Sequence, residues 1–225
     1  FLHHTIFFCR LQGKYEAVVT RKRGLNYVLA FGRMLPYNGV KKRESFERCQ
    51  MEEEIMNSFQ ALCPYIRVAW NSYCAAPWEV PERIIFDWEL LYIKEGAVRI
   101  TIGDDVYHAK AGSIFLLKPG KRHSIALLGC SKLHQPHIHF DLITQEDSEQ
   151  VKVNFQQREA LNQREIAMIR DDITAPGCEM EMPDRITVSN LLEFERLLFD
   201  VINTHTAREP LYQIETKSKF LSLWA

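Results

Sequence analysis

The stretch Gly112–His123, GSIFLLKPGKRH, decides how we interpret this chain. It contains a short apolar strand between two turns. Gly112 permits a turn before the strand, and Pro119-Gly120 favours a tight reversal after it. His123 then falls at the start of the next strand. This order predicts a corner of a β-barrel whose polar side chains point into a mouth, and therefore a pocket.

Short segments of alternating residues continue on both sides of this corner. Upstream, Ile66, Val68 and Trp70 alternate with Arg67, Ala69 and Asn71, which is the period of a strand. Glycines between the segments supply turns that need positive φ. The further strands that this pattern predicts are Arg83–Lys94, Ala97–Ile102, Asp105–Ala109, Ser113–Lys118, Ser124–Leu128 and Pro136–Ile143. Many short strands separated by glycine favour a sandwich or barrel, so we expect a mainly β fold with α-helices at its C-terminal end.

The hydrophobic period shifts toward that of a helix after Glu146. The charged segment Gln157–Asp172 predicts a surface helix, and Leu211–Ala225 predicts another. Between them, Ser189 or Asn190 can cap a helix that carries a wide apolar face. We expect one edge of this face to pack on the barrel and the other to meet a second subunit. The residues expected to form the dimer interface are Leu191, Phe194, Leu198 and Val201.

Composition and charge place the chain in a broad class. It has 225 residues, of which 46% are hydrophobic and 25% charged, and a formal net charge of −1. These values are typical of a soluble globular protein and give no strong overall attraction to nucleic acid or membrane. The six cysteines include no C-x-x-C pair, which argues against a zinc knuckle or a redox dithiol. With no signal peptide and no apolar run of membrane-spanning length, we expect a cytoplasmic protein.

The first 50 residues differ from the rest, because they hold ten Lys and Arg against three Glu. Strands are possible at Tyr15–Thr20 and Tyr27–Phe31, and a turn at 36–39. Two interpretations stay open: a basic arm that docks on DNA or a partner, or upstream sequence that precedes a native start at Met51. The division that we expect is a basic extension over 1–50, a ligand-binding barrel over 51–150 and a helical dimerisation region over 151–225.

Several motifs together resemble the cupin-type sensor domain of AraC-type transcription regulators. The residues that carry the resemblance are Tyr73-Cys74, Pro81-Glu82-Arg83, Glu89–Gly96, Gly112–His123 and Gln135–Leu142. The resemblance runs from about Val68 to the C-terminus. It implies a cupin-like double-stranded β-barrel (jelly roll) that binds a small molecule, followed by a helical dimerisation element and then two helix-turn-helix units that bind DNA. The sequence contains no recognisable helix-turn-helix pair, so we expect a fragment and a homodimer whose DNA-binding domain lies outside it.

The resemblance also places one face of the predicted strand Arg83–Lys94 inside the barrel. A guanidinium and carboxylates in a partly apolar lumen suit a sugar or a small organic acid as the effector. The residues expected to bind it are Arg83, Asp87, Glu89, His123, His137 and His139. Trp88 and Tyr92 are expected to point outward, and His108 and His134 to lie on the surface.

A metal site is the alternative use of these residues. Metal-binding cupins carry an H-x-H pair shortly before a Glu, and if Glu89 is that Glu, the pair falls on Arg83 and Ile85. His137 and His139 lie two apart on one face of a strand and could substitute, joining Glu89 and His123 around Zn, Fe or Mn. This alternative is a metal-dependent cupin enzyme, an isomerase or a dioxygenase. The missing H-x-H pair favours a sensor without metal, cofactor or catalytic residues.

Overall fold

The computed structural model describes residues 7–11, 15–22, 25–31, 62–129, 132–170, 174–175, 178–179 and 182–225. The chain divides into two units, and residues 63–171 and 184–225 make up the larger one. The predicted turn at 36–39 and the possible start at Met51 lie outside the described residues. Among the described residues, no helix has the length and apolar character needed to cross a membrane.

The smaller unit contains a three-stranded antiparallel sheet of order β1-β2-β3. Its strands are β1 (Phe7–Leu11), β2 (Tyr15–Lys22) and β3 (Leu25–Phe31), so both strands predicted in this region are confirmed. A short hairpin of β12 (Thr174–Ala175) and β13 (Cys178–Glu179) belongs to the same unit.

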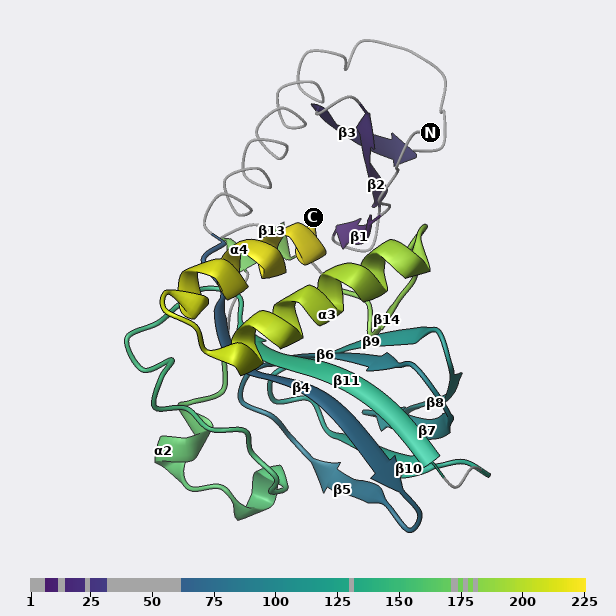
Figure 1. Ribbon diagram of the computed structural model, residues 1–225, viewed down its shortest axis with the longest axis vertical. Helices are drawn as coiled ribbons and strands as arrows, with labels where there is room; N and C mark the ends of the chain where they lie inside the picture. Colours follow the sequence, from purple (N-terminus) through teal and green to yellow (C-terminus); the bar gives the residue numbers. More distant parts are fainter. Residues whose placement is uncertain are drawn as a thin grey trace. The chain divides into compact units, whose positions relative to one another are not determined.

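The larger unit is built on two antiparallel sheets that form a cupin-like fold (Figure 1). The five-stranded sheet has the order β14-β9-β6-β11-β4, and the four-stranded sheet has the order β5-β10-β7-β8. The first contains β4 (Tyr65–Ala75), β6 (Trp88–Ile93), β9 (Ser113–Leu117), β11 (Lys132–Asp141) and β14 (Arg185–Ile186). The second contains β5 (Glu79–Arg83), β7 (Ala97–Ile102), β8 (Asp105–Lys110) and β10 (His123–Leu127).

Apolar side chains fill the space between the two sheets. Leu91 and Ile93 of β6 meet Ile100 and Ile102 of β7 in one buried cluster, together with Phe115 of β9. Strand β7 alternates buried and less buried residues, because only one of its faces is covered. Strands β6 and β9 are buried along their whole length, so both of their faces must be covered. The predicted corner is confirmed, since Gly112 and Gly120 both have positive φ, near +90° and +69°.

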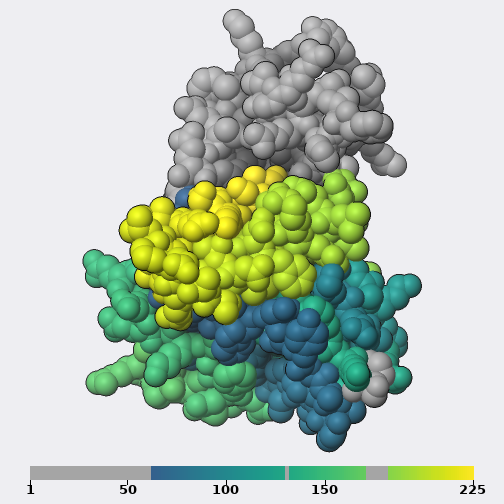
Figure 2. All heavy atoms as spheres, viewed as in Figure 1, coloured from purple at the N-terminus to yellow at the C-terminus, as the bar shows by residue number. Residues whose placement is uncertain are grey.

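Two C-terminal helices cover the outer face of the five-stranded sheet, α3 (Leu191–Ala207) and α4 (Tyr212–Trp224). Figure 1 shows α3 running along this sheet with α4 next to it, and Figure 2 shows the two helices side by side as a continuous layer next to β4. Phe220 and Trp224 pack on Phe140 of β11, which fixes α4 to the sheet. As predicted, Asn190 caps α3, because its side-chain oxygen accepts a hydrogen bond from the Glu193 backbone N–H at 3.2 Å.

Two predicted elements differ from the structure. The predicted strand Arg83–Lys94 is broken after Arg83, where the chain leaves one sheet and enters the other. The crossing segment, Ile84–Phe86, takes its backbone hydrogen bonds from connecting segments instead of a strand: Ile84 N–H donates to Gln156 O, and Phe86 O accepts from Arg170 N–H. The predicted helix Gln157–Asp172 was wrong, since only η1 (Arg158–Ala160) and α2 (Gln163–Ile166) form there. The apolar residues of this region, Leu161, Met168 and Ile169, pack on Ile84 and Phe86, although a continuous helix does not form there.

Candidate functional site: a buried cluster of charged and imidazole side chains

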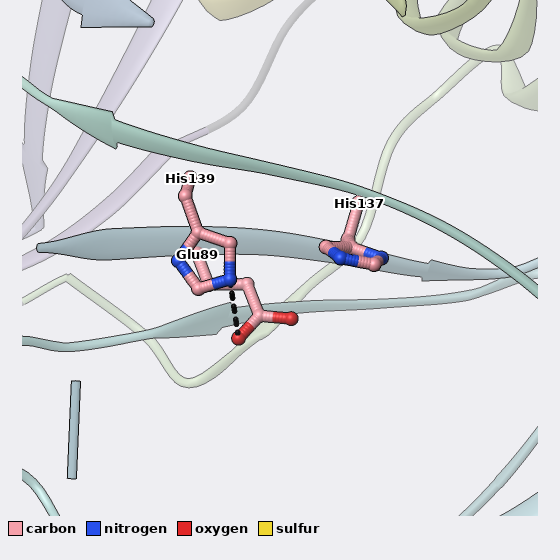
Figure 3. Close-up of side chains that lie close together, drawn as sticks. All are labelled: Glu89, His137 and His139. Carbon is pink, nitrogen blue, oxygen red and sulfur yellow. Dashed lines mark ion pairs between the residues drawn. The ribbon is translucent and has the colours of Figure 1, made fainter. Parts of the chain in front are cut away.

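Three polar side chains meet on two neighbouring strands of the five-stranded sheet. His139 of β11 lies directly opposite Glu89 of β6, and His137 lies opposite Leu91. Residues paired in this way project to the same side of a sheet, as do residues two apart along a strand. Figure 3 shows both imidazole rings on one side of β11, with the Glu89 carboxylate beside them. His139 Nε2 lies 3.4 Å from Glu89 Oε2, and all three residues are buried.

Arg83 joins this group to His123. It is 5% exposed, and its guanidinium donates from Nη2 to Glu89 Oε2 and from Nε to His123 Nε2, each at 3.1 Å. A third donor, Nη1, reaches Asn154 O at 3.2 Å. His123 lies opposite Arg83 where β10 pairs with β5, and its Nδ1 lies 3.2 Å from Lys121 O. The His123 proton is therefore on Nδ1, because Nε2 accepts from Arg83.

Asp87 holds the other side of His139. His139 Nδ1 lies 3.1 Å from Asp87 Oδ1, and Asp87 Oδ2 accepts from Arg67 Nε at 2.9 Å. Arg67 continues to Asp141 Oδ1 at 2.8 Å, and Asp141 in turn accepts from Arg170 at 3.1 Å. This row of alternating charges fixes the orientation of the His139 ring. The sequence did not reveal the roles of Arg67, Asp141 and Arg170, because their partners lie 20 to 74 positions away along the chain.

The environment sets the charge of each group in the cluster. Burial raises the pKa of Glu89, but His139 and Arg83 lower it more, so that the pKa falls to about 2 and the carboxylate is ionised at neutral pH. Burial lowers the pKa of His123 to about 4, and it lowers the pKa of His137 as well. His123 and His137 are therefore neutral at pH 7, and each leaves its Nε2 as a hydrogen-bond acceptor.

Two exposed aromatic rings contact the edge of the buried cluster. Trp70 of β4 is 51% exposed, and its ring centroid lies 5.5 Å from that of His137, with the rings perpendicular. Phe155 is also exposed, and the guanidinium of Arg83 lies 4.9 Å from the centre of its ring. These contacts mark His137 and Arg83 as the members of the cluster that lie nearest to solvent-exposed side chains.

The opposite face of β6 meets α3 instead of solvent. Tyr92 points away from the barrel interior, as predicted, but it is buried because it packs on Phe194 and its hydroxyl donates to Glu195. Lys94 pairs with the same carboxylate at 2.7 Å. Burial and the Glu195 carboxylate together raise the pKa of Tyr92, so its hydroxyl stays a donor. Strand β6 thus contacts the polar cluster on one face and α3 on the other.

The six residues that the sequence suggested for ligand binding lie together as one connected and buried set. The four suggested for a dimer interface lie on α3, where Phe194, Leu198 and Val201 are buried within the chain itself and Leu191 is 37% exposed. The prediction for His108 is confirmed, since it is exposed. The prediction for His134 was wrong: it is 7% exposed, since it stacks on Tyr73 and hydrogen-bonds Asn71 Oδ1 at 2.6 Å.

Two antiparallel sheets around an apolar core, with polar side chains gathered on one inner face, define a cupin-like domain. Residues 72–167 match the family model of the AraC-like ligand binding domain. This part of the chain is an AraC-like ligand-binding domain. It contains all six residues that the sequence suggested for ligand binding.

Solved structures with similar folds have low sequence identity to this chain. YhaK from Escherichia coli is 20% identical over 41% of this chain and 43% of its own, with a TM-score of 0.32. The Cnp3 cupin domain of Schizosaccharomyces pombe is 13% identical over 52% and 74%, with a TM-score of 0.29. A predicted oxalate decarboxylase from Thermotoga maritima is 15% identical over 63% and 94%, with a TM-score of 0.31. The chain thus spans less than half of the length of YhaK, and no match was found among the curated proteins.

Proposed function

We propose that this chain is the effector-binding part of a cytoplasmic transcription regulator, and that a sugar or a small organic acid binds at the buried polar cluster. The observation that carries the proposal is the position of this cluster, inside the segment that matches the AraC-like ligand-binding family. The regulator would act through a DNA-binding domain that this sequence does not contain.

The cluster offers both kinds of hydrogen-bonding group that a hydroxylated ligand needs. The ionised Glu89 carboxylate and the Nε2 of His137 accept hydrogen bonds from hydroxyl groups. Arg83 has five N–H donors, and three of them have partners within the chain, so two can serve a ligand oxygen. A ligand carboxylate would meet Arg83 on one side and Glu89 on the other, and this juxtaposition favours neutral polyols over organic acids.

Strand β6 connects the proposed ligand site with helix α3. A ligand that moves Glu89 displaces β6, and Tyr92 on this strand and Lys94 directly after it hold Glu195 of α3. The ligand can bias the helices only as far as it binds one arrangement of β6 more tightly than the other. The mutual orientation of two α3 helices in a dimer would then depend on the effector.

A homodimer is part of this proposal, with its interface on the helical layer. Since Phe194, Leu198 and Val201 already pack inside the chain, the interface would use the apolar side chains that α3 and α4 leave exposed. These are Leu191, Leu192, Ile214 and Leu221. Sedimentation equilibrium tests this point: Leu192→Arg should shift a dimer to a monomer without loss of helical content. A dimer that persists in this variant would place the interface elsewhere.

Calorimetry against a panel of aldoses, polyols and small hydroxy acids tests effector binding. The titrations are run in EDTA, so that the result does not depend on any metal ion. Glu89→Gln keeps the size of the side chain and removes its charge, and it should weaken binding of the best ligand by about tenfold or more. Glu82→Gln, at an exposed position on β5, is the matched control. Equal affinity in all three proteins would remove the cluster as the binding site.

A metal-dependent cupin enzyme is the second candidate, because Glu89, His137 and His139 could hold an ion. His123, which the sequence suggested as a further ligand, fits this role poorly, since both of its ring nitrogens have hydrogen-bonding partners. Metal-dependent turnover of a small substrate that is lost in His139→Ala would favour the enzyme over the sensor.

A further inference from the structure

We infer that Glu89, His137 and His139 bind a divalent transition-metal ion, such as Zn²⁺, Mn²⁺ or Fe²⁺, with coordination positions left open. The Nε2 atoms of the two histidines and a carboxylate oxygen of Glu89 would be the ligands. The inference concerns the ion alone and does not depend on whether an organic effector binds.

The first support is the orientation of the two rings. His139 Nδ1 faces Asp87 Oδ1 and His137 Nδ1 faces Gln135 O, each at 3.1 Å. Both partners are acceptors, so each Nδ1 carries a proton, and in the neutral ring each Nε2 keeps its lone pair. A carboxylate or carbonyl that accepts from the far nitrogen is the arrangement that commonly holds a metal-binding histidine in place. Both rings are fixed in this way before any ion arrives.

The second support is a conflict between acceptors that a cation resolves. In the neutral form of His139, the lone pair on Nε2 faces the ionised oxygen of Glu89 at 3.4 Å, and either a proton or a metal ion must then lie between these two acceptors. Two ligands on one tetrahedral Zn²⁺ are roughly 3.3–3.5 Å apart. The pair therefore already has the spacing of a coordination edge. The alternative is a proton on His139 Nε2, which would donate to Glu89 in place of the ion.

The third ligand is close enough to join. One ligand atom from each of Glu89, His137 and His139 lies within 4.8 Å of the others. Figure 3 shows the His137 ring on the same side of β11 as His139, so that ring or the carboxylate has to turn toward the other two ligands to close the set. The hydrogen bond from Arg83 does not block the ion, because a carboxylate has about four lone-pair sites on its two oxygens.

The types of ligand also suit such an ion. Two imidazoles and one carboxylate with open positions suit Zn²⁺, Mn²⁺ or Fe²⁺. An open position would let an effector or water complete the coordination shell.

The test is calorimetric titration of the EDTA-treated and dialysed full chain with ZnCl₂ at pH 7. The expected result is about one Zn²⁺ per chain at this site, with an affinity that falls by about tenfold or more in His137→Ala. The Co²⁺ complex of the wild type should show ligand-field absorption that this variant lacks. His108→Ala, which changes an exposed histidine, is the matched control and should bind as the wild type does.

A second comparison excludes binding elsewhere. The chain begins with adjacent histidines, His3 and His4, that could capture an ion by themselves. A His3→Ala/His4→Ala variant should keep the site that His137→Ala loses. His137→Gln serves if His137→Ala has lost its native circular dichroism spectrum. The inference is overturned if folded variants at His137 bind Zn²⁺ as tightly as the wild type, or if the wild type binds none.

Discussion

Replacing Arg83 with methionine should destabilise this domain far more than the same change at an exposed arginine. Methionine keeps most of the length of the side chain but removes the guanidinium, whose three hydrogen bonds hold Glu89, His123 and the Asn154 carbonyl. The Glu89 carboxylate would then stay buried, at 3% exposure, without the guanidinium that donates a hydrogen bond to it. Removing one member of a buried ion pair typically costs about 3–5 kcal/mol.

Urea unfolding, followed by tryptophan fluorescence and circular dichroism, measures this cost. In a thermal melt the same loss corresponds to a fall in Tm of about 6–20 °C. Arg122→Met is the matched control, because Arg122 is 51% exposed and its pairs with Glu82 and Asp104 are long, at 3.9 and 3.8 Å. It should cost less than about 1 kcal/mol.

The double variant Arg83→Met/Glu89→Leu separates the two causes of the loss. If an unpaired buried charge causes it, removing that charge as well should restore most of the stability. A single variant that costs under about 1 kcal/mol would refute the reasoning. So would a double variant that is less stable than Arg83→Met alone, since Glu89 would then stabilise the fold without Arg83.

Three further predictions concern pH, the helix contact and the helix cap. Burial lowers the pKa of His123 from 6.5 to about 4, so between these pH values the unfolded chain binds a proton at this residue and the folded chain does not. The free energy of unfolding should therefore be highest above pH 6.5 and fall by about 3 kcal/mol toward pH 4. Urea unfolding at each pH measures this fall. Tyr92→Phe removes the donor to Glu195 and should cost about 1 kcal/mol and loosen α3, seen as faster amide exchange in that helix. Asn190→Ala removes the cap of α3 and should cost about 1 kcal/mol in urea unfolding.

Each of these three predictions has its own control. A His123→Gln variant should show a flatter dependence of stability on pH, and an unchanged slope would mean that other groups cause it. Phe199→Leu changes an aromatic side chain on α3 without touching the Tyr92 hydroxyl, so equal exchange in both variants would argue against a special role for that hydrogen bond. Asn190→Ser keeps a capping oxygen and should stay near wild type; a loss equal to that of alanine would contradict the capping role.

The sequence alone determined the succession of the strands along the chain and the turns between them. Alternation of period two is a local property, so β7 was predicted with its observed bounds and β8, β9 and β10 to within one residue. The turns at glycines with positive φ could be predicted as well, because the conformation that a glycine permits depends on that one residue. Spacing of period two grouped Arg83, Asp87 and Glu89 on one face and His137 with His139 on another, and the resemblance to a family placed the first of these faces inside the barrel.

Tertiary structure alone decided how those residues act on one another. Sequence periodicity could not show that β5 ends at Arg83 and that β6 begins after the sheet crossing, because the backbone partners of Ile84–Phe86 lie on distant segments. It could not show that Arg67 and Asp87 orient His139, or that His123 is held by Arg83 while His137 and His139 face Glu89. Hydrogen bonds and ion pairs depend on distances of about 3 Å between atoms, and only the packing of the two sheets brings these atoms that close. The sequence supplies these residues, but the packing of the two sheets determines which of them contact one another.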